Sequence, residues 1–198
     1  MANELQINIG DSWKEADSIK INISDAWKEV SEIQINIGDT WKTAWKRKAA
    51  YFKVRYRAKN ALGSYNGSIG VQIGAAGSYE TGSWNSSWTN METAALTVAG
   101  TSYTESECAS MQVRLGSGPI AGGEAYYISE IEVDIYDDSD NLLATVKPNS
   151  DDTLTWDSTG ANHYTEVDQG ISGADDAKYV YTDAAYEVEY LGLENPSW

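Results

Sequence analysis

The residue types that perform catalysis are sparse in this sequence. His163 is the single histidine and Cys108 the single cysteine, and no serine lies in a nucleophile-elbow pattern that would pair with His163. Aspartate and glutamate are abundant but spread through turns, so no acid and nucleophile pair can be singled out. A lone cysteine excludes an internal disulfide, and we interpret Cys108 as a small buried apolar residue. The sequence therefore predicts a protein that is not an enzyme and uses no cofactor.

Side chains with oxygen ligands gather in two loops, at Asp137, Asp138, Asp140 and Asn141, and at Asp151 and Asp152. Hard oxygen ligands clustered in loops suit calcium. However, a calcium loop counted from Asp138 would put Leu143 where glycine is required and Asn149 where glutamate is required. We therefore predict turns with solvated charges and no metal site.

Aromatic residues offer a different chemistry. Tyr79, Trp84 and Trp88 fall in a region rich in glycine and serine. Exposed rings can stack on the apolar face of a sugar while polar neighbours orient it, so these three residues are candidates for binding a glycan. The alternative is that they fill the core, because a β-protein with one phenylalanine needs its Trp and Tyr for that purpose. The sequence favours the core role.

Three near-copies of a 14-residue unit open the chain, with Ile-Asn-Ile beginning at positions 7, 21 and 35. Apolar residues two apart indicate β-strands, and Gly10-Asp11 indicates a turn, so each unit is predicted to be a hairpin. A two-residue turn would place Trp13 opposite Asn8, whereas a three-residue loop with a bulge would place it beside Ile9. We favour the second register.

A hairpin of this size cannot bury its own apolar face. The three units must stack together, cap their own domain, or add to the sheet of another subunit. We interpret residues 1–48 as an anchoring module, with a packed extension of the same domain as the alternative. The predicted assembly contacts are the repeated isoleucines and tryptophans, namely Ile7, Ile9, Trp13, Ile21, Ile23, Trp27, Ile35, Ile37 and Trp41.

Short runs rich in Val, Ile, Thr and Tyr, separated by turn residues, predict an all-β fold: an antiparallel β-sandwich, jelly-roll-like, over residues 49–148. The expected strands are 51–59, 68–74, 93–99, 109–115, 125–136 and 142–146, the last two forming a hairpin around an acidic turn. Residues 149–198 are interpreted as an acidic C-terminal extension that is ordered only by packing on something else.

The strand at 51–59 alternates almost perfectly. Its apolar members, Phe52, Val54, Tyr56 and Ala58, are expected to point inward. Its other members form a basic stripe, Lys53, Arg55, Arg57 and Lys59. This stripe would contact an acidic neighbour or be solvated, and we favour a solvated face.

Charge divides the chain unevenly. Residues 1–59 carry 11 Lys and Arg against 8 Asp and Glu, whereas residues 60–198 carry 3 against 22. A basic end and an acidic body would let copies dock on one another, although the acidity alone would also serve solubility. Most of the surface would repel a polyanion, so nucleic acid is not expected as a partner. The sequence has no long apolar run and no secretion signal at its start, so no membrane partner is expected.

The unit Ile-Asn-Ile-Gly-Asp-x-Trp-Lys resembles short β-repeats of virion proteins from tailed bacteriophages and related prophages, over residues 5–42. Residues 155–168 and 175–181 also resemble a motif of phage virion proteins with jelly-roll domains, where it leads into a further β-sandwich that does not follow here. The resemblance implies a structural subunit at the particle surface, a decoration or accessory protein of head or tail that is assembled in the host cytoplasm. Its implied partners are other virion proteins and further copies of itself. The alternative from another class is an adhesin module that binds a cell-surface glycan.

Overall fold

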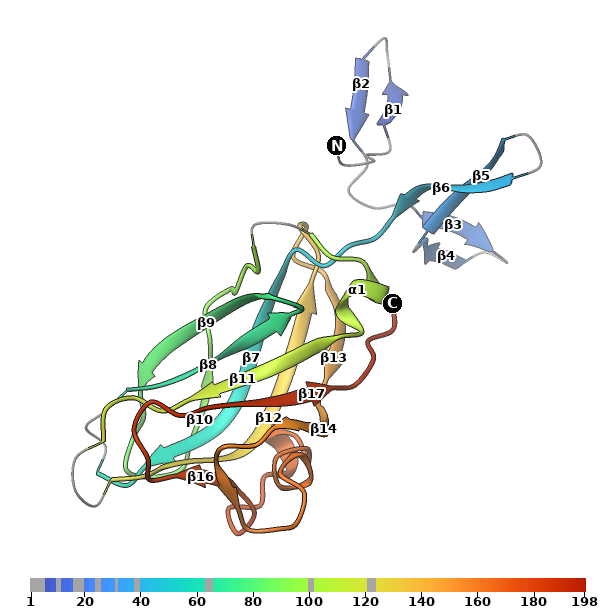
Figure 1. Ribbon diagram of the computed structural model, residues 1–198. Helices are drawn as coiled ribbons and strands as arrows, with labels where there is room; N and C mark the ends of the chain where they lie inside the picture. The colour runs from blue at the N-terminus through green and yellow to red at the C-terminus, as the bar shows by residue number, and fades with distance from the viewer. Residues whose placement is uncertain are drawn as a thin grey trace.

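The computed structural model describes residues 6–9, 12–15, 20–23, 26–30, 32–37, 40–62, 66–99, 102–120 and 124–198. Two antiparallel sheets face one another and form a β-sandwich, as Figure 1 shows. The one α-helix in these residues is the short α1 (Glu105–Cys108). The predicted all-β sandwich is confirmed. Within the described segments, no helix has the length and apolar character needed to cross a lipid bilayer.

The first sheet has six strands and the second has five. In order across the first sheet they are β10 (Thr89–Glu92), β7 (Tyr51–Asn60), β12 (Tyr126–Tyr136), β16 (Val180–Thr182) and β15 (Asp157–Ser158), with β13 (Leu142–Val146) also paired to β12. Across the second they are β14 (Pro148–Thr153), β17 (Val188–Leu193), β11 (Met111–Gly116), β8 (Asn66–Ile73) and β9 (Ala76–Ser83).

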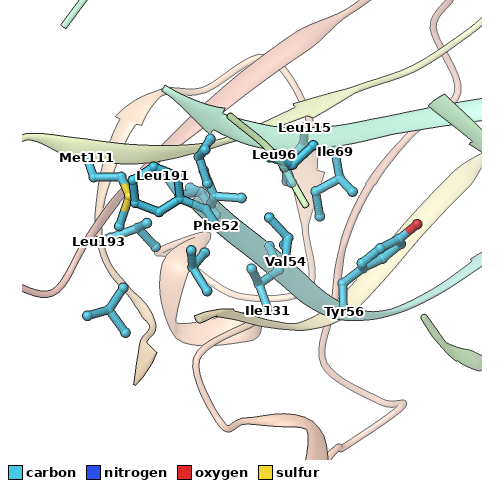
Figure 2. Close-up of a cluster of buried hydrophobic side chains, with 14 of the residues drawn as sticks. Phe52, Val54, Tyr56, Ile69, Leu96, Met111, Leu115, Ile131, Leu191 and Leu193 are labelled. Atoms are coloured by element: carbon cyan, nitrogen blue, oxygen red, sulfur yellow. The ribbon is translucent and has the colours of Figure 1, made fainter. Parts of the chain in front are cut away.

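The core lies between the two sheets and follows the alternation of the strands. Phe52, Val54, Tyr56 and Ala58 of β7 are all buried, which confirms the predicted inward face. Figure 2 shows Phe52, Val54 and Tyr56 in one cluster with apolar side chains of the opposite sheet, such as Ile69, Leu115 and Leu191. Each buried aliphatic or aromatic side chain of this kind contributes about 1.5 to 3 kcal/mol by leaving water.

The sandwich continues beyond residue 148, where the sequence predicted its end. Strand β17 lies between β14 and β11, and β16 pairs with β12, so the supposed extension supplies strands to both sheets. Leu191 and Leu193 of β17 belong to the core. The boundary at 148 is wrong. The sequence shows a strand-like run at 178–182 and an apolar run at 186–193, but the acidic, turn-rich composition around them led us to interpret the whole segment as an extension.

Two further differences concern strands of the middle segment. The expected strand at 93–99 is a single bridge between Leu96 and Phe52, preceded by the short β10. Strand β9 was not predicted, because its sequence lacks apolar alternation. It is an edge strand with mostly exposed residues, and an edge needs little apolar pattern once β8 supplies the core face.

The N-terminal repeats form three separate hairpins. They pair β1 (Gln6–Ile9) with β2 (Ser12–Glu15), β3 (Lys20–Ile23) with β4 (Ala26–Glu29), and β5 (Glu32–Ile37) with β6 (Thr40–Lys46). The described strands of these hairpins join no strand of the sandwich.

The favoured register of the repeats is wrong. Ile9 pairs with Ser12 and Asn8 with Trp13, so the loop has two residues in place of three. The same register recurs with Asn22 opposite Trp27 and Asn36 opposite Trp41. Two-residue loops match the twist of the flanking strands, and this outweighed the apolar pairing that we expected. The side chains of the nine predicted assembly contacts lie outside the described residues: Ile7, Ile9, Trp13, Ile21, Ile23, Trp27, Ile35, Ile37 and Trp41.

Candidate functional site

A row of aromatic residues crosses the outer surface of the first sheet. In the strand register, Lys59 of β7 is opposite Tyr127 of β12, Tyr127 is opposite Tyr181 of β16, and Tyr181 is opposite Asp157 of β15. Trp88 directly precedes β10, whose first residue Thr89 pairs with Ala58, and this places the indole beside Lys59. Directly opposed residues share one face of a sheet, so the row is continuous across four strands, with Trp88 beside its β7 end.

The rings of this row contact one another. Tyr127 and Tyr181 are stacked, with ring centroids 5.8 Å apart, and Tyr179 meets both of them edge to face at 5.4 Å and 5.9 Å. Trp88 lies 6.4 Å from Tyr127 and 6.0 Å from Tyr179. These separations are typical of favourable aromatic pairs. All four rings remain partly exposed. We call Trp88, Tyr127, Tyr179, Tyr181 and Lys59 the aromatic face.

Lys59 supplies the positive charge of the aromatic face. Its Nζ lies 4.7 Å from the Trp88 ring centroid and 4.8 Å from that of Tyr127, which are cation–π distances. The pKa of Tyr127 is raised, first by burial and then by Tyr179 and Tyr181, so its hydroxyl keeps its proton at neutral pH. The face therefore offers ring surfaces, a hydroxyl donor and an ammonium group.

The other members of the basic stripe pair with carboxylates of the same chain. Lys53 pairs with Glu92 at 3.1 Å, Arg55 with Asp134 at 2.7 Å, and Arg57 with Asp176 at 2.6 Å. The favoured interpretation of a purely solvated face is therefore wrong. The acidic body folds back on β7: Asp134 comes from β12, Glu92 from β10, and Asp176 from the segment before β16.

The three residues predicted to bind a glycan lie in three different places in the structure. Trp84 is 1% exposed and packs on Tyr56 and Tyr126, so it belongs to the core and offers no ring to a ligand. Tyr79 is 56% exposed on edge strand β9 of the other sheet, with the Arg114 guanidinium 4.3 Å from its ring. Only Trp88, of the three, lies on the aromatic face.

Sequence reasoning missed Tyr127, Tyr179 and Tyr181. The signal was present, because tyrosines at 179 and 181 are two apart and so share a face of a strand. Tyr127 was hidden by its neighbour Tyr126, which is buried while Tyr127 points outward. Their meeting with Trp88 depends on a strand order that brings β10, β7, β12 and β16 together.

The residues weighed for catalysis lie apart from this face. Cys108 is buried, and desolvation followed by the charge of Glu107 raises the pKa of its thiol to about 12. His163 Nδ1 is 3.0 Å from Oε1 of Glu189, a fully buried carboxylate. Burial raises the pKa of Glu189, and the hydrogen bond with His163 opposes this effect. This pair joins the 155–166 segment to β17.

The carboxylate of Asp137 accepts hydrogen bonds within the acidic turn. Its Oδ1 accepts hydrogen bonds from the backbone N–H groups of Ser139 and Asn141 at 3.0 Å and 2.9 Å, and from Nδ2 of Asn141 at 3.1 Å. Such bonds fix an Asx turn, and Nε of Arg47 lies 3.8 Å from Oδ2 of Asp137. Across the described part of the chain, no group of three or more His, Cys, Asp or Glu is arranged to hold a metal ion.

Comparisons with known proteins give one weak likeness. No family model matches the chain, and no curated protein matches it. Among solved structures, it is similar to vCBM60, a carbohydrate-binding module described with two families of calcium-dependent modules related by circular permutation. The two share 12% sequence identity over 72% of this chain and 91% of that one, with a TM-score of 0.34. A likeness of this size carries no argument about the ligand of this chain.

Proposed function

We propose that this chain is a non-enzymatic binding protein whose β-sandwich recognises carbohydrate through the aromatic face. The observation that carries the proposal is the register that places Trp88, Lys59, Tyr127 and Tyr181 in one row on the outside of the sheet. A rigid sheet holds such rings at fixed separations, so little ordering entropy is lost when a flat ligand settles on them.

Sugar rings suit this surface for a chemical reason. Their C–H faces pack on aromatic rings while their hydroxyls need polar partners at the rim. The phenol groups of Tyr127, Tyr179 and Tyr181 and the carboxylate of Asp157 are available around the rings as such partners. A purely apolar partner would leave these polar groups unpaired at a cost.

Glycan-array binding with the purified chain tests the proposal. Replacing Trp88 with Ala should weaken binding about tenfold or more, equivalent to about 1.4 kcal/mol or more. Tyr79→Ala is the matched control, because it removes an exposed ring that also lies beside a cation but on the other sheet. Equal binding by the wild type and Trp88→Ala would refute the proposal, once circular dichroism shows that both are folded.

A second function is proposed for the N-terminal hairpins: attachment of the chain to a bacteriophage particle as a decoration or accessory subunit. The observation that favours it is that all three hairpins repeat one register and pair with no strand of the sandwich. Repeated ribbons with open edges can add to the sheets of neighbouring subunits. The partners would be other virion proteins and further copies of this chain.

The attachment proposal is tested by deleting residues 1–46 and measuring incorporation into particles. We expect incorporation to be lost while the sandwich stays folded, because Ala49 is the first core residue along the chain among those described. Normal incorporation of the truncated chain would overturn attachment through the hairpins. Glycan binding should be unchanged by the deletion, since the aromatic face begins at Lys59, and this separates the two functions.

A further inference from the structure

We propose that Lys59 makes the aromatic face selective for acidic saccharides, those that carry a carboxylate or sulfate. This inference rests on the proposed carbohydrate binding and names its ligand class. It starts from a contrast along β7: Lys53, Arg55 and Arg57 each have a carboxylate partner in the same chain. Among the described residues Lys59 forms no ion pair, and its ammonium lies instead over Trp88 and Tyr127.

The position of the ammonium favours an anion on the ligand. Cation–π contacts hold Lys59 beside the rings but leave its N–H donors without an anionic acceptor. A saccharide stacked on Trp88 or Tyr127 would bring its substituents next to this ammonium. A carboxylate or sulfate there gains a charge-assisted hydrogen bond, which is about twice as strong as a neutral one.

The aromatic face carries opposite charges at its two ends, and these would orient such a ligand. Lys59 lies at one end of the row, next to Trp88, and Asp157 lies at the other end beyond Tyr181. Asp176 already binds Arg57 through two hydrogen bonds. The anionic group of the sugar is therefore expected near Lys59, with its hydroxyls donating to Asp157.

The charge of the whole chain makes this local cation important. The formal net charge is −16, so an acidic saccharide is repelled over most of the surface and is attracted where a cation has no internal partner. A ligand cation is disfavoured at the same place, because it would meet the like charge of the Lys59 ammonium. A neutral saccharide would gain only the favourable free energy of stacking on the aromatic rings.

The experiment compares neutral, carboxylated and sulfated glycans printed at equal density, probed with the full chain and three variants. Lys59→Met removes the charge and keeps an apolar stem on the rings. Lys178→Met is the matched control, because Lys178 is exposed, adjoins Tyr179 and carries the same charge but belongs to none of the ring contacts of the row. Trp88→Ala removes the stacking surface.

The expected result is preferential binding of acidic glycans by the wild type, with about a tenfold loss for Lys59→Met and no comparable loss for Lys178→Met. Binding of neutral glycans that is lost in Trp88→Ala but kept in Lys59→Met would overturn the acidic selectivity and leave the proposed function intact. Equal losses in Lys59→Met and Lys178→Met would overturn the specific role of Lys59, because the loss would then follow from the net charge of the chain alone. Binding to no glycan of any class would overturn the proposed function itself.

Discussion

The guanidinium of Arg55 on β7 donates two parallel hydrogen bonds to the carboxylate of Asp134 on β12, from Nε to Oδ2 at 2.7 Å and from Nη2 to Oδ1 at 2.8 Å. Its third nitrogen, Nη1, lies 2.7 Å from Oε2 of Glu132. Both carboxylates are almost fully enclosed, with Asp134 5% and Glu132 9% exposed. One arginine therefore pairs with two enclosed acids on a central strand of the first sheet, and Lys147 Nζ lies 4.0 Å from Oε1 of Glu132 as a second cation.

Arg55→Met should lower the free energy of unfolding by about 2 to 3 kcal/mol, because it leaves two enclosed carboxylates without their shared cation. This loss in free energy of unfolding is smaller than that expected for a fully buried ion pair, because the Arg55 side chain is partly exposed. Urea unfolding of the variant and the wild type measures the difference.

Lys53→Met on the same strand is the control for Arg55→Met. The Lys53 and Glu92 side chains are 31% and 47% exposed, and ion pairs that remain in contact with water contribute little to stability. A loss for Arg55→Met no larger than that for Lys53→Met would contradict a central role for the Arg55 contacts.

The sequence alone predicted the class of fold, and the reason is visible in β7 and in the hairpin of β12 and β13. Strict alternation of apolar and polar residues in 51–59 predicts a strand with one buried face. The acidic turn at 137–141 separates two segments of high β-propensity, which predicts a hairpin. Among the strands that escaped prediction, β9 and β14 have little apolar pattern, and each lies at an edge of the second sheet. Edge strands owe their position to hydrogen bonds with a neighbour, which composition does not reveal.

The candidate site was less predictable than the fold. Trp84 and Trp88 lie in the same stretch of sequence, yet one is in the core and the other on the aromatic face. Composition cannot separate them, because the direction of each ring depends on local backbone between β9 and β10. Similarly, Tyr127 and Tyr181 are brought together only by the pairing of β12 with β16, a long-range contact that local patterns do not encode.

Trp84→Ala should cost about 3 to 5 kcal/mol of stability, because it empties a large buried site between Tyr56 and Tyr126. The site is tight: a Cβ added at Gly67 would lie 2.5 Å from Cε2 of Trp84, so the surroundings are shaped to the indole. Tyr79→Ala should change stability by about 0.5 kcal/mol or less, because that ring is exposed. Thermal and urea unfolding compare the two, and similar losses would contradict the buried position of Trp84.

A chain ending at Lys147 should fail to fold. The truncation removes β14, β16 and β17, and β17 is paired on both sides, with β14 and with β11. Its loss would expose the core at Val113 and Leu115 of β11, which are fully buried in the intact sandwich. Amide dispersion in a nitrogen-proton NMR spectrum reports the outcome. A well-dispersed spectrum from residues 47–147 would show that the first part of the sandwich is an independent domain after all.

The thiol of Cys108 should be unreactive in the folded protein. Burial, and then the negative charge of Glu107, raise its pKa to about 12, so almost no thiolate forms at neutral pH. A disulfide reagent added at about pH 8 should modify the native chain at the rate of global or local opening, and the urea-unfolded chain within the mixing time. Equal rates for native and unfolded protein would contradict the enclosed position of Cys108.

Glu130 should make the stability of the sandwich fall as pH rises from acidic to neutral. Its side chain is fully buried, and desolvation raises its pKa to about 7, an effect that the hydrogen bond from the backbone N–H of Asp175 opposes. Because the folded pKa lies above the unfolded one, the unfolded chain releases its proton first, near pH 4.5, while the folded chain holds it. The stabilisation is therefore complete below about pH 4.5 and is lost as the pH passes about 7, by at most about 3 kcal/mol.

Glu130→Gln keeps the acceptor for Asp175 but cannot ionise, so its free energy of unfolding should exceed that of the wild type by a margin that grows between about pH 5 and about pH 8. Urea unfolding across this range measures the margin. A margin for Glu130→Gln that stays constant with pH would mean that the buried carboxyl does not titrate in this interval.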